Sequence, residues 1–137
     1  MTLPQKTQER VKMPNHSQPG LIFPIDYSEV LERIGGDRIF LEELLKIYVE
    51  DYEEKSRLIR EALVSQDFGS VQKLGHSLKG SSANLSLVFL KKASLELELA
   101  GRDRNLELAR CAFASLEEEF RKLRDYLQQN PPAAQGC

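Results

Sequence analysis

The strongest constraint on the fold of this chain is the spacing of its apolar residues between Asp103 and Gln129. These residues recur in alternating steps of three and four: Leu106, Ala109, Phe113, Leu116, Phe120, Leu123 and Leu127. Because an α-helix turns by about 100° per residue, this spacing places all of them along one face of a helix. One narrow apolar face predicts a helix that packs lengthwise against others at a shallow angle.

Two upstream segments show the same periodicity and begin at residues that commonly cap helices. Asp26 is the expected N-cap of a short helix that extends to about Ile34, where a Gly-Gly pair ends it. Asp37 is the expected N-cap of a long helix that extends to about Ser65. The apolar stripe of this long helix consists of Leu41, Leu44, Leu45, Tyr48, Tyr52, Ile59, Ala62 and Leu63.

Two more helices are expected before the last one. Asp67 is the expected N-cap of a helix from Phe68 to about Leu85. Ser86 is the candidate cap of the following helix, which Gly101 is expected to end. The apolar residues of this following helix are Leu87, Leu90, Ala93, Leu97 and Ala100. Amphipathic helices with short connections predict an all-α fold: an antiparallel up-and-down four-helix bundle with a short extra N-terminal helix.

Length and composition indicate one domain. The chain has 137 residues, of which 41% are hydrophobic and 29% are charged, as in ordinary globular domains. Residues 1–24 are mostly polar and rich in proline, which predicts a flexible N-terminal segment. The bundle is expected to span residues 25–130. Residues 131–137 begin with a Pro-Pro pair that stops a helix, and they are expected to form a short tail.

Several classes of function are disfavoured by what the sequence lacks. The formal net charge of −2 argues against a nucleic-acid-binding protein. No apolar run is long enough to span a bilayer and no signal peptide is evident, so a cytoplasmic location without membrane attachment is expected. His16 is interpreted as a solvated residue of the N-terminal segment. Two free thiols, Cys111 and Cys137, are favoured over a disulfide between them, and neither a structural metal nor a cofactor is expected.

The helix that begins at Phe68 carries the histidine of greatest interest. Its buried face is expected to consist of Phe68, Val71, Leu74, Leu78, Ser82 and Leu85. His76 lies roughly 160° around the helix from both Leu74 and Leu78, so it is predicted to face the solvent. An isolated exposed histidine is usually an ordinary surface residue. Its neighbours therefore decide whether His76 has a function.

The residues around His76 form a cationic surface without bulky side chains. Gln72 and Lys73 precede it by one turn, Lys79 and Gly80 follow by one turn, and Ala83 lies further along. A glycine within a helix costs about 1 kcal/mol relative to alanine. Tight packing inside the bundle does not explain that cost for Gly80, because its position faces outward. Close approach of a partner protein does explain it.

This surface suits phosphoryl chemistry. Nearby positive charge disfavours the protonated imidazole and leaves a nitrogen lone pair for attack, and the same charge stabilises phosphoryl oxygens after transfer. No carboxylate that would have the opposite effect is expected on this face. Lys79 is therefore the candidate phosphate-stabilising residue. The candidate partner-binding residues are Gln72, Lys73, Gly80 and Ala83.

The segment from His76 to Leu85, His-Ser-Leu-Lys-Gly-Ser-Ser-Ala-Asn-Leu, resembles the signature of the histidine-containing phosphotransfer (HPt) domain family. Further similar features are the Ile-Gly-Gly-Asp turn at residues 34–37 and a set of flanking residues: Leu41, Leu44, Leu45, Leu90, Ala93, Leu97 and Glu98. The resemblance covers about residues 26–127. One departure is Ser86, where the family often has glycine. A slightly different turn without loss of activity is expected there.

The resemblance implies a four-helix bundle in which His76 accepts a phosphoryl group from a receiver-domain aspartate and passes it to another receiver. It also implies that Lys79 supports the phosphate and that Gly80 leaves room for the partner. Magnesium would belong to the receiver, so the chain is expected to be a phosphoryl carrier and not an enzyme. The implied partners are receiver domains of response regulators or of hybrid histidine kinases. The chain is expected to be a monomer, because a four-helix core is self-sufficient.

Two alternatives stay open. The chain can be a phosphotransfer module cut from a larger hybrid or chemotaxis-type histidine kinase, although it has no glycine-rich nucleotide-binding segment of its own. It can also be a helical module that binds a receiver without carrying phosphate. The second alternative predicts that replacing His76 has no effect. The identity of the receivers is not specified by Gln72, Lys73 or Leu74.

Overall fold

The fold is all-α, as predicted. The computed structural model describes residues 23–132, and within this range it contains five helices and no strand. The expectations for the N-terminal segment with His16 and for the tail with Cys137 fall almost entirely on residues 1–22 and 133–137, which lie outside the described residues.

The first three helices begin where the sequence predicted. They are α1 (Tyr27–Arg33), α2 (Arg38–Ser65) and α3 (Phe68–Asn84). The side chain of the residue before each helix accepts a hydrogen bond from the backbone N–H three residues further on, and these capping residues are the predicted Asp26, Asp37 and Asp67. Aspartate at this position satisfies an N–H group that has no partner within the helix, and its negative charge suits the helix N-terminus.

The boundaries of the last two helices, α4 (Val88–Arg102) and α5 (Leu106–Gln129), differ from the prediction. The N-cap of α4 is Leu87, which makes no side-chain hydrogen bond, so Ser86 is not the cap. Gly101 lies inside α4 and is buried, so it does not end the helix. The N-cap of α5 is Asn105, whose side chain accepts a hydrogen bond from the N–H of Leu108, so α5 begins later than Asp103.

Ser86 has a different role, in the turn between α3 and α4. Its backbone is left-handed, with φ at 58°, a conformation that glycine adopts at the least cost. The hydroxyl of Ser86 donates a hydrogen bond of 2.6 Å to Glu29, and its carbonyl accepts one of 3.1 Å from the N–H of Asp26. The turn is therefore fixed against the start of α1. The left-handed backbone is a physical reason for the glycine that the resemblance implies at this position.

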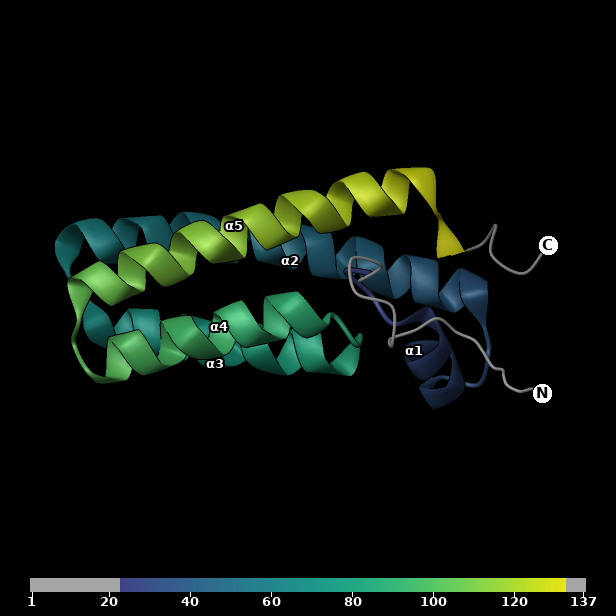
Figure 1. Cartoon of the computed structure of the whole chain (residues 1–137), viewed down its shortest axis with the longest axis horizontal. Helices are drawn as coiled ribbons and strands as arrows, with labels where there is room; N and C mark the ends of the chain where they lie inside the picture. The colour runs from purple at the N-terminus through teal and green to yellow at the C-terminus, as the bar shows by residue number, and fades with distance from the viewer. Residues whose placement is uncertain (1–22, 133–137) are drawn as a thin grey trace, which may run out of the picture.

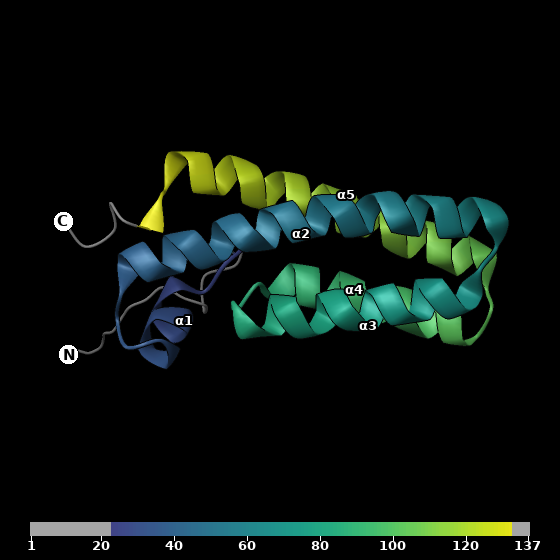
Figure 2. The ribbon, with the colours of Figure 1, turned by 180° about the vertical axis from the view of Figure 1, so that it is seen from behind.

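Helices α2, α3, α4 and α5 lie lengthwise beside one another, and successive helices run in opposite directions (Figure 1). Contacts join α2 with α3, α3 with α4, α4 with α5 and α5 with α2. The shorter α1 lies at the end where α3 stops and α4 starts, and the view from behind shows the same placement (Figure 2). Arg33 of α1 makes hydrogen bonds of 3.2 and 2.6 Å to the carbonyls of Ala83 and Asn84, which are the last residues of α3.

The core fills the space between these four helices. Its fully buried members come from every long helix and include Leu41, Tyr52, Ile59, Val71, Leu78, Leu90, Leu97, Leu116 and Leu123. Two polar contacts of core tyrosines join neighbouring helices. The hydroxyls of Tyr48 on α2 and Ser82 on α3 are 2.8 Å apart, and Tyr52 donates to Glu117 on α5 at 2.6 Å. These contacts fix how α2 is rotated against α3 and α5.

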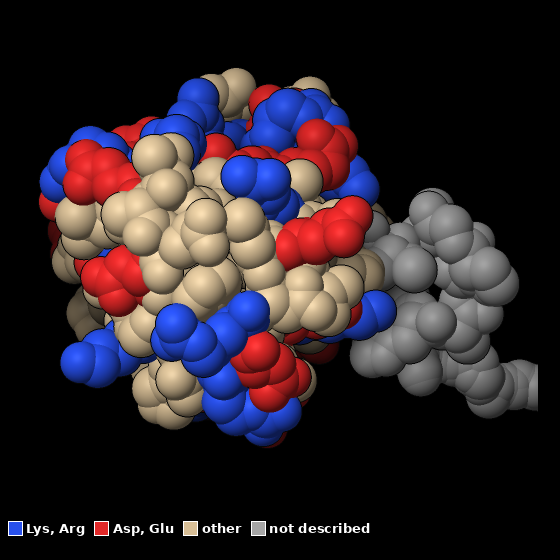
Figure 3. All heavy atoms as spheres, turned by 90° about the vertical axis from the view of Figure 1, so that its left-hand side faces the viewer, with Lys and Arg blue, Asp and Glu red and all other residues tan. Residues whose placement is uncertain are grey.

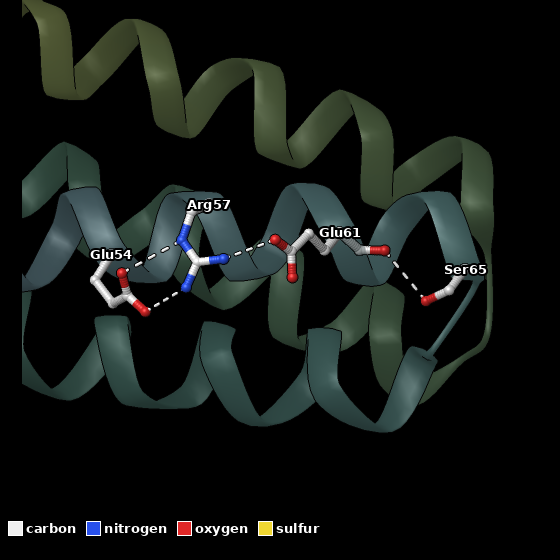
Figure 4. Close-up of polar contacts among 4 residues, drawn as sticks. All are labelled: Glu54, Arg57, Glu61 and Ser65. Carbon is white, nitrogen blue, oxygen red and sulfur yellow. Dashed lines mark hydrogen bonds and ion pairs between the residues drawn. The ribbon is translucent and has the colours of Figure 1, made fainter.

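The surface carries charges of both signs. Acidic and basic residues are interspersed around an uncharged centre on the end of the molecule that carries the α2–α3 and α4–α5 connections (Figure 3). Along α2, Arg57 pairs with Glu54 at 2.6 Å and with Glu61 at 2.7 Å, and Ser65 donates to the Glu61 carbonyl (Figure 4). None of the helices in the described part of the chain is long and apolar enough to cross a membrane.

Candidate functional site

The histidine-bearing helix α3 is held on one side and at both ends. Asp67 caps its start, and Arg33 of α1 binds the carbonyls at its end. Val71, Leu78 and Ser82 are completely buried. Leu74, expected in the same face, is only partly buried against the core. The opposite side of α3 is therefore presented to solvent on a fixed support.

His76 stands on this exposed side. Its side chain is 68% exposed, as the helix geometry predicted. The imidazole is not isolated, because its Nδ1 lies 3.0 Å from Oε2 of Glu98 on α4. The side chain of Glu98 is only 16% exposed, so this carboxylate approaches the ring from the α3–α4 side. The other ring nitrogen, Nε2, has no contact of this kind among the described residues.

Lys79 binds the same carboxylate. Its Nζ lies 2.9 Å from Oε1 of Glu98, the oxygen that His76 does not contact. The contact with the Lys79 ammonium holds the pKa of the Glu98 carboxyl below its usual range; burial opposes this shift, and the contact with His76 reinforces it. Glu98 is therefore ionised near neutral pH. One carboxylate bridges the histidine and the lysine.

The ionised Glu98 determines which nitrogen of His76 carries the hydrogen. A carboxylate without a proton can only accept hydrogen bonds, so Nδ1 of His76 must donate. In the neutral ring the lone pair is then on Nε2. The arrangement presents a nucleophilic nitrogen on the exposed edge of the ring, with its orientation fixed by a charged acceptor on the other edge.

The presence of Glu98 corrects one expectation. The sequence of α3 contains no carboxylate, so none was expected beside His76. Glu98 comes from the neighbouring helix, and its distance to the ring depends on how closely α3 and α4 pack. The family resemblance includes Glu98, and this resemblance is the feature of the sequence that points to Glu98.

The candidate partner-binding residues lie at different places around His76. Nothing lies within 4 Å of the point where a Cβ of Gly80 would stand, so the surface is open there. Lys73 is exposed and lines a groove between α2 and α3 together with Leu58, Glu61 and other residues. Gln72 and Ala83 are half-buried. Gln72 lies against α4 and the carbonyl of Ala83 is bound by Arg33, so these two are less available to a partner than Gly80.

Two glycines lie at the contact between α3 and α4, and the sequence did not predict this packing. Gly75 and Gly101 are buried where α3 meets α4, and a Cβ at either position would lie within 3.0 Å of the backbone of the other helix. The prediction of Gly101 as a helix end is wrong, and the sequence gives no separate signal for the packing of Gly75. A glycine within a helix signals close approach of another backbone, but the sequence does not say which backbone.

The described residues contain no group of three or more His, Cys, Asp or Glu side chains that could hold a metal ion. Cys111 is exposed and free in the structure.

Within residues 23–132, the geometry is that of a small helical protein with a histidine, His76, oriented by a carboxylate on an open surface. Comparisons with known proteins agree with this description. The model of the Hpt domain family matches residues 43–129, which is more than half of the chain. The chain therefore belongs to the Hpt domain family of histidine phosphotransfer proteins, which function in phosphorelays.

Among solved structures, the chain is similar to histidine-containing phosphotransfer protein B (HptB) from Pseudomonas aeruginosa PAO1. The two share 28% sequence identity with a TM-score of 0.69, and the similarity covers 77% of this chain and 92% of HptB. No curated protein sequence gives a significant match.

Proposed function

We propose that His76 is the phosphoacceptor of this protein, and that it receives a phosphoryl group from a receiver-domain aspartate and passes it to another receiver. The observation that carries the proposal is the contact between Nδ1 of His76 and Glu98 on an otherwise exposed ring. This contact leaves Nε2 as the nucleophile and directs it away from the bundle. The family membership supplies the class of reaction.

In the forward step the Nε2 lone pair attacks the phosphorus of an aspartyl phosphate. A nitrogen–phosphorus bond forms, the phosphorus–oxygen bond to the aspartate breaks, and the aspartate leaves as a carboxylate. The hydrogen on Nδ1 stays in place, so the phosphorylated ring carries a positive charge. The Glu98 carboxylate, 3.0 Å from Nδ1, stabilises that charge. Transfer to the next receiver reverses these bond changes.

Lys79 stabilises the phosphoryl group in this proposal. In the free protein its ammonium is paired with Glu98, 2.9 Å away. Three phosphoryl oxygens on the adjacent histidine carry more negative charge than one carboxylate that is shared with the imidazole. The flexible lysine side chain therefore turns toward the phosphoryl group once it is attached.

The protein acts as a carrier in this scheme, and the receiver supplies the magnesium ion and the in-line geometry of transfer. Its partners are receiver domains of response regulators or hybrid histidine kinases. We infer that the fold is an up-and-down four-helix bundle over residues 25–130 with a short extra N-terminal helix. The order and pairing of α2 to α5 support this inference. A monomeric, cytoplasmic protein fits the same proposal.

The test is incubation of the chain with a phosphorylated receiver domain, followed by measurement of acid-labile, base-stable phosphate on the chain. The wild type is expected to gain this phosphate and His76→Gln is expected to gain none. Equal labelling of the two proteins would refute His76 as the acceptor. Receiver binding without any labelling would instead identify a docking module that carries no phosphate.

A further inference from the structure

The backbones of α3 and α4 come closest at two glycines. A Cβ at Gly75 of α3 would lie 2.7 Å from the backbone nitrogen of Glu98 and 3.0 Å from the carbonyl oxygen of Ser94. A Cβ at Gly101 of α4 would lie 2.6 Å from the backbone nitrogen of Gln72. These distances are shorter than side chains tolerate, and the neighbouring atoms are backbone atoms that no rotamer change can move. Each glycine therefore sets the local separation of the two helices.

The contact at Gly75 differs from the contact at Gly101 in what it touches. Gly75 lies against the backbone of Glu98 itself, and it directly precedes His76. The side chain of Glu98 extends from that point to Nδ1 of His76 and to Nζ of Lys79. One of the two places of closest approach between α3 and α4 is thus the place from which the Glu98 carboxylate reaches the imidazole.

We propose that Gly75 is a positioning residue for His76: by letting the α4 backbone lie against α3 at Glu98, it places the carboxylate that orients the imidazole. The consequence for phosphoryl transfer rests on the function proposed above. The geometric part does not, because it concerns only which nitrogen of His76 carries the hydrogen in the free protein.

The alternative role for Gly75 is to allow dense packing without any effect on His76. The two roles differ in the tautomer of the imidazole. If Gly75→Ala pushes the Glu98 backbone away, the hydrogen bond from Nδ1 weakens and the ring loses its preference for the hydrogen on that nitrogen. Weakening of this hydrogen bond to a charged acceptor, without its complete loss, is expected to change the ratio of tautomers by roughly threefold to tenfold. A purely structural role would leave this ratio unchanged in the folded variant.

The experiment is ¹⁵N NMR of the His76 ring at a pH where the imidazole is neutral, applied to the full chain and its variants. Gly75→Ala is expected to lower the ratio of Nδ1–H to Nε2–H tautomer. Gly69→Ala is the matched control in the same helix, because its Cβ would meet only a side-chain oxygen of Asp67 at an ordinary 3.7 Å. This control is expected to keep the wild-type ratio. A folded Gly75→Ala protein with the wild-type ratio would overturn the proposal.

Two further variants identify the route of the effect. Glu98→Asp shortens the side chain without a backbone clash and is expected to reproduce the tautomer change. In a Glu98→Ala background, the addition of Gly75→Ala is expected to change nothing more, because the carboxylate that Gly75 positions is gone. An equal shift in both backgrounds would show that Gly75 does not act through Glu98. If Gly75→Ala unfolds in buffer, the spectra are recorded with trimethylamine N-oxide, which favours the compact state.

Labelling with a small phosphoryl donor distinguishes the positioning role of Gly75 from the proposed function of His76. Phosphoramidate, a small phosphoryl donor that needs no docking surface, is used to label His76; the Nε2–phosphorus bond forms and ammonia leaves. If the wild type takes phosphate and Gly75→Ala takes it at least threefold more slowly with an altered tautomer, both ideas are supported. If the wild type takes no phosphate from phosphoramidate or a receiver while the tautomer responds to Gly75→Ala, only the proposed function fails. A wild type that takes phosphate, with the tautomer ratio of Gly75→Ala unchanged, refutes the positioning role alone.

Discussion

Replacing Lys79 with alanine tests the electrostatic part of the proposed chemistry. A hydrogen bond between charged groups contributes about 1.5–3 kcal/mol. Lys79 must first give up its ion pair with Glu98, and a pair in which the lysine is 29% exposed contributes about 1 kcal/mol or less. The net contribution to the phosphorylated state is then about 0.5–2 kcal/mol. We therefore expect phosphoryl transfer to be slower by about twofold to thirtyfold.

The assay is single-turnover transfer from a phosphorylated receiver to the chain, followed by rapid quenching. Lys73→Ala is the matched control, because it removes the same charge from an exposed lysine one turn before His76. Lys73 lines the α2–α3 groove and is not part of the contact with Glu98. At a saturating receiver concentration, where a contribution of Lys73 to docking does not limit the rate, Lys73→Ala is expected to slow transfer less than about twofold, since the exposed charge is screened. Equal rates for Lys79→Ala and Lys73→Ala, with helicity retained in both, would contradict the specific role of Lys79.

Three more predictions follow from the site and its support. Gly80→Leu is expected to keep the fold, because the surface there is open, yet to weaken receiver binding at least tenfold; unchanged affinity measured by calorimetry would show that this surface is not a contact. Since the folded-state pKa of Glu98 is lowered, its contribution to stability is present above the usual pKa of 4.5 and is lost as the pH falls through the lowered value. The gap in unfolding free energy between wild type and Glu98→Gln should therefore be larger at neutral pH than at about pH 3, and urea titrations in which the gap does not shrink would count against the ionised carboxylate. Tyr48→Phe leaves the buried hydroxyl of Ser82 without its partner and should cost about 1–3 kcal/mol, whereas an unchanged denaturation midpoint would mean that the pair contributes little.

The helices and the exposure of His76 could be predicted because both depend on local sequence. A capping aspartate such as Asp37 or Asp67 acts within its own helix turn, and the apolar period gives the buried face directly. The outward angle of His76 needs only the position of that face. The start of α4 was less predictable, because it depends on the backbone conformation of the preceding turn. Ser86 was predicted as a cap because serine is common at helix N-termini, but its backbone is left-handed, with φ at 58°, and Leu87 is the N-cap.

The contact between Glu98 and His76 could not be predicted from the sequence of α3 alone. Glu98 lies 22 residues after His76, and its contact with the ring depends on the distance and register between α3 and α4. That distance is set by Gly75 and Gly101, whose close approaches become apparent only when both backbones are placed. A glycine within a helix indicates close approach of another backbone, which can belong to a neighbouring helix or to a partner protein. At Gly80 the sequence correctly suggested open surface, and at Gly101 the same residue type was mistaken for a helix end.

The anchoring of α3 has a consequence for how the protein exchanges partners. Because Asp67 secures one terminus of this helix and Arg33 the other, attachment of a phosphoryl group to the outer edge of His76 is expected to alter charge and the position of the Lys79 side chain while the helix itself stays in place. The loaded and unloaded forms then offer nearly the same shape to an incoming protein. Under the proposed function, donor and recipient receivers both reach His76 from the same face, so they compete for it and cannot occupy it together. Tight binding to either one would then slow the flow of signal, because the other could not dock until the first departed.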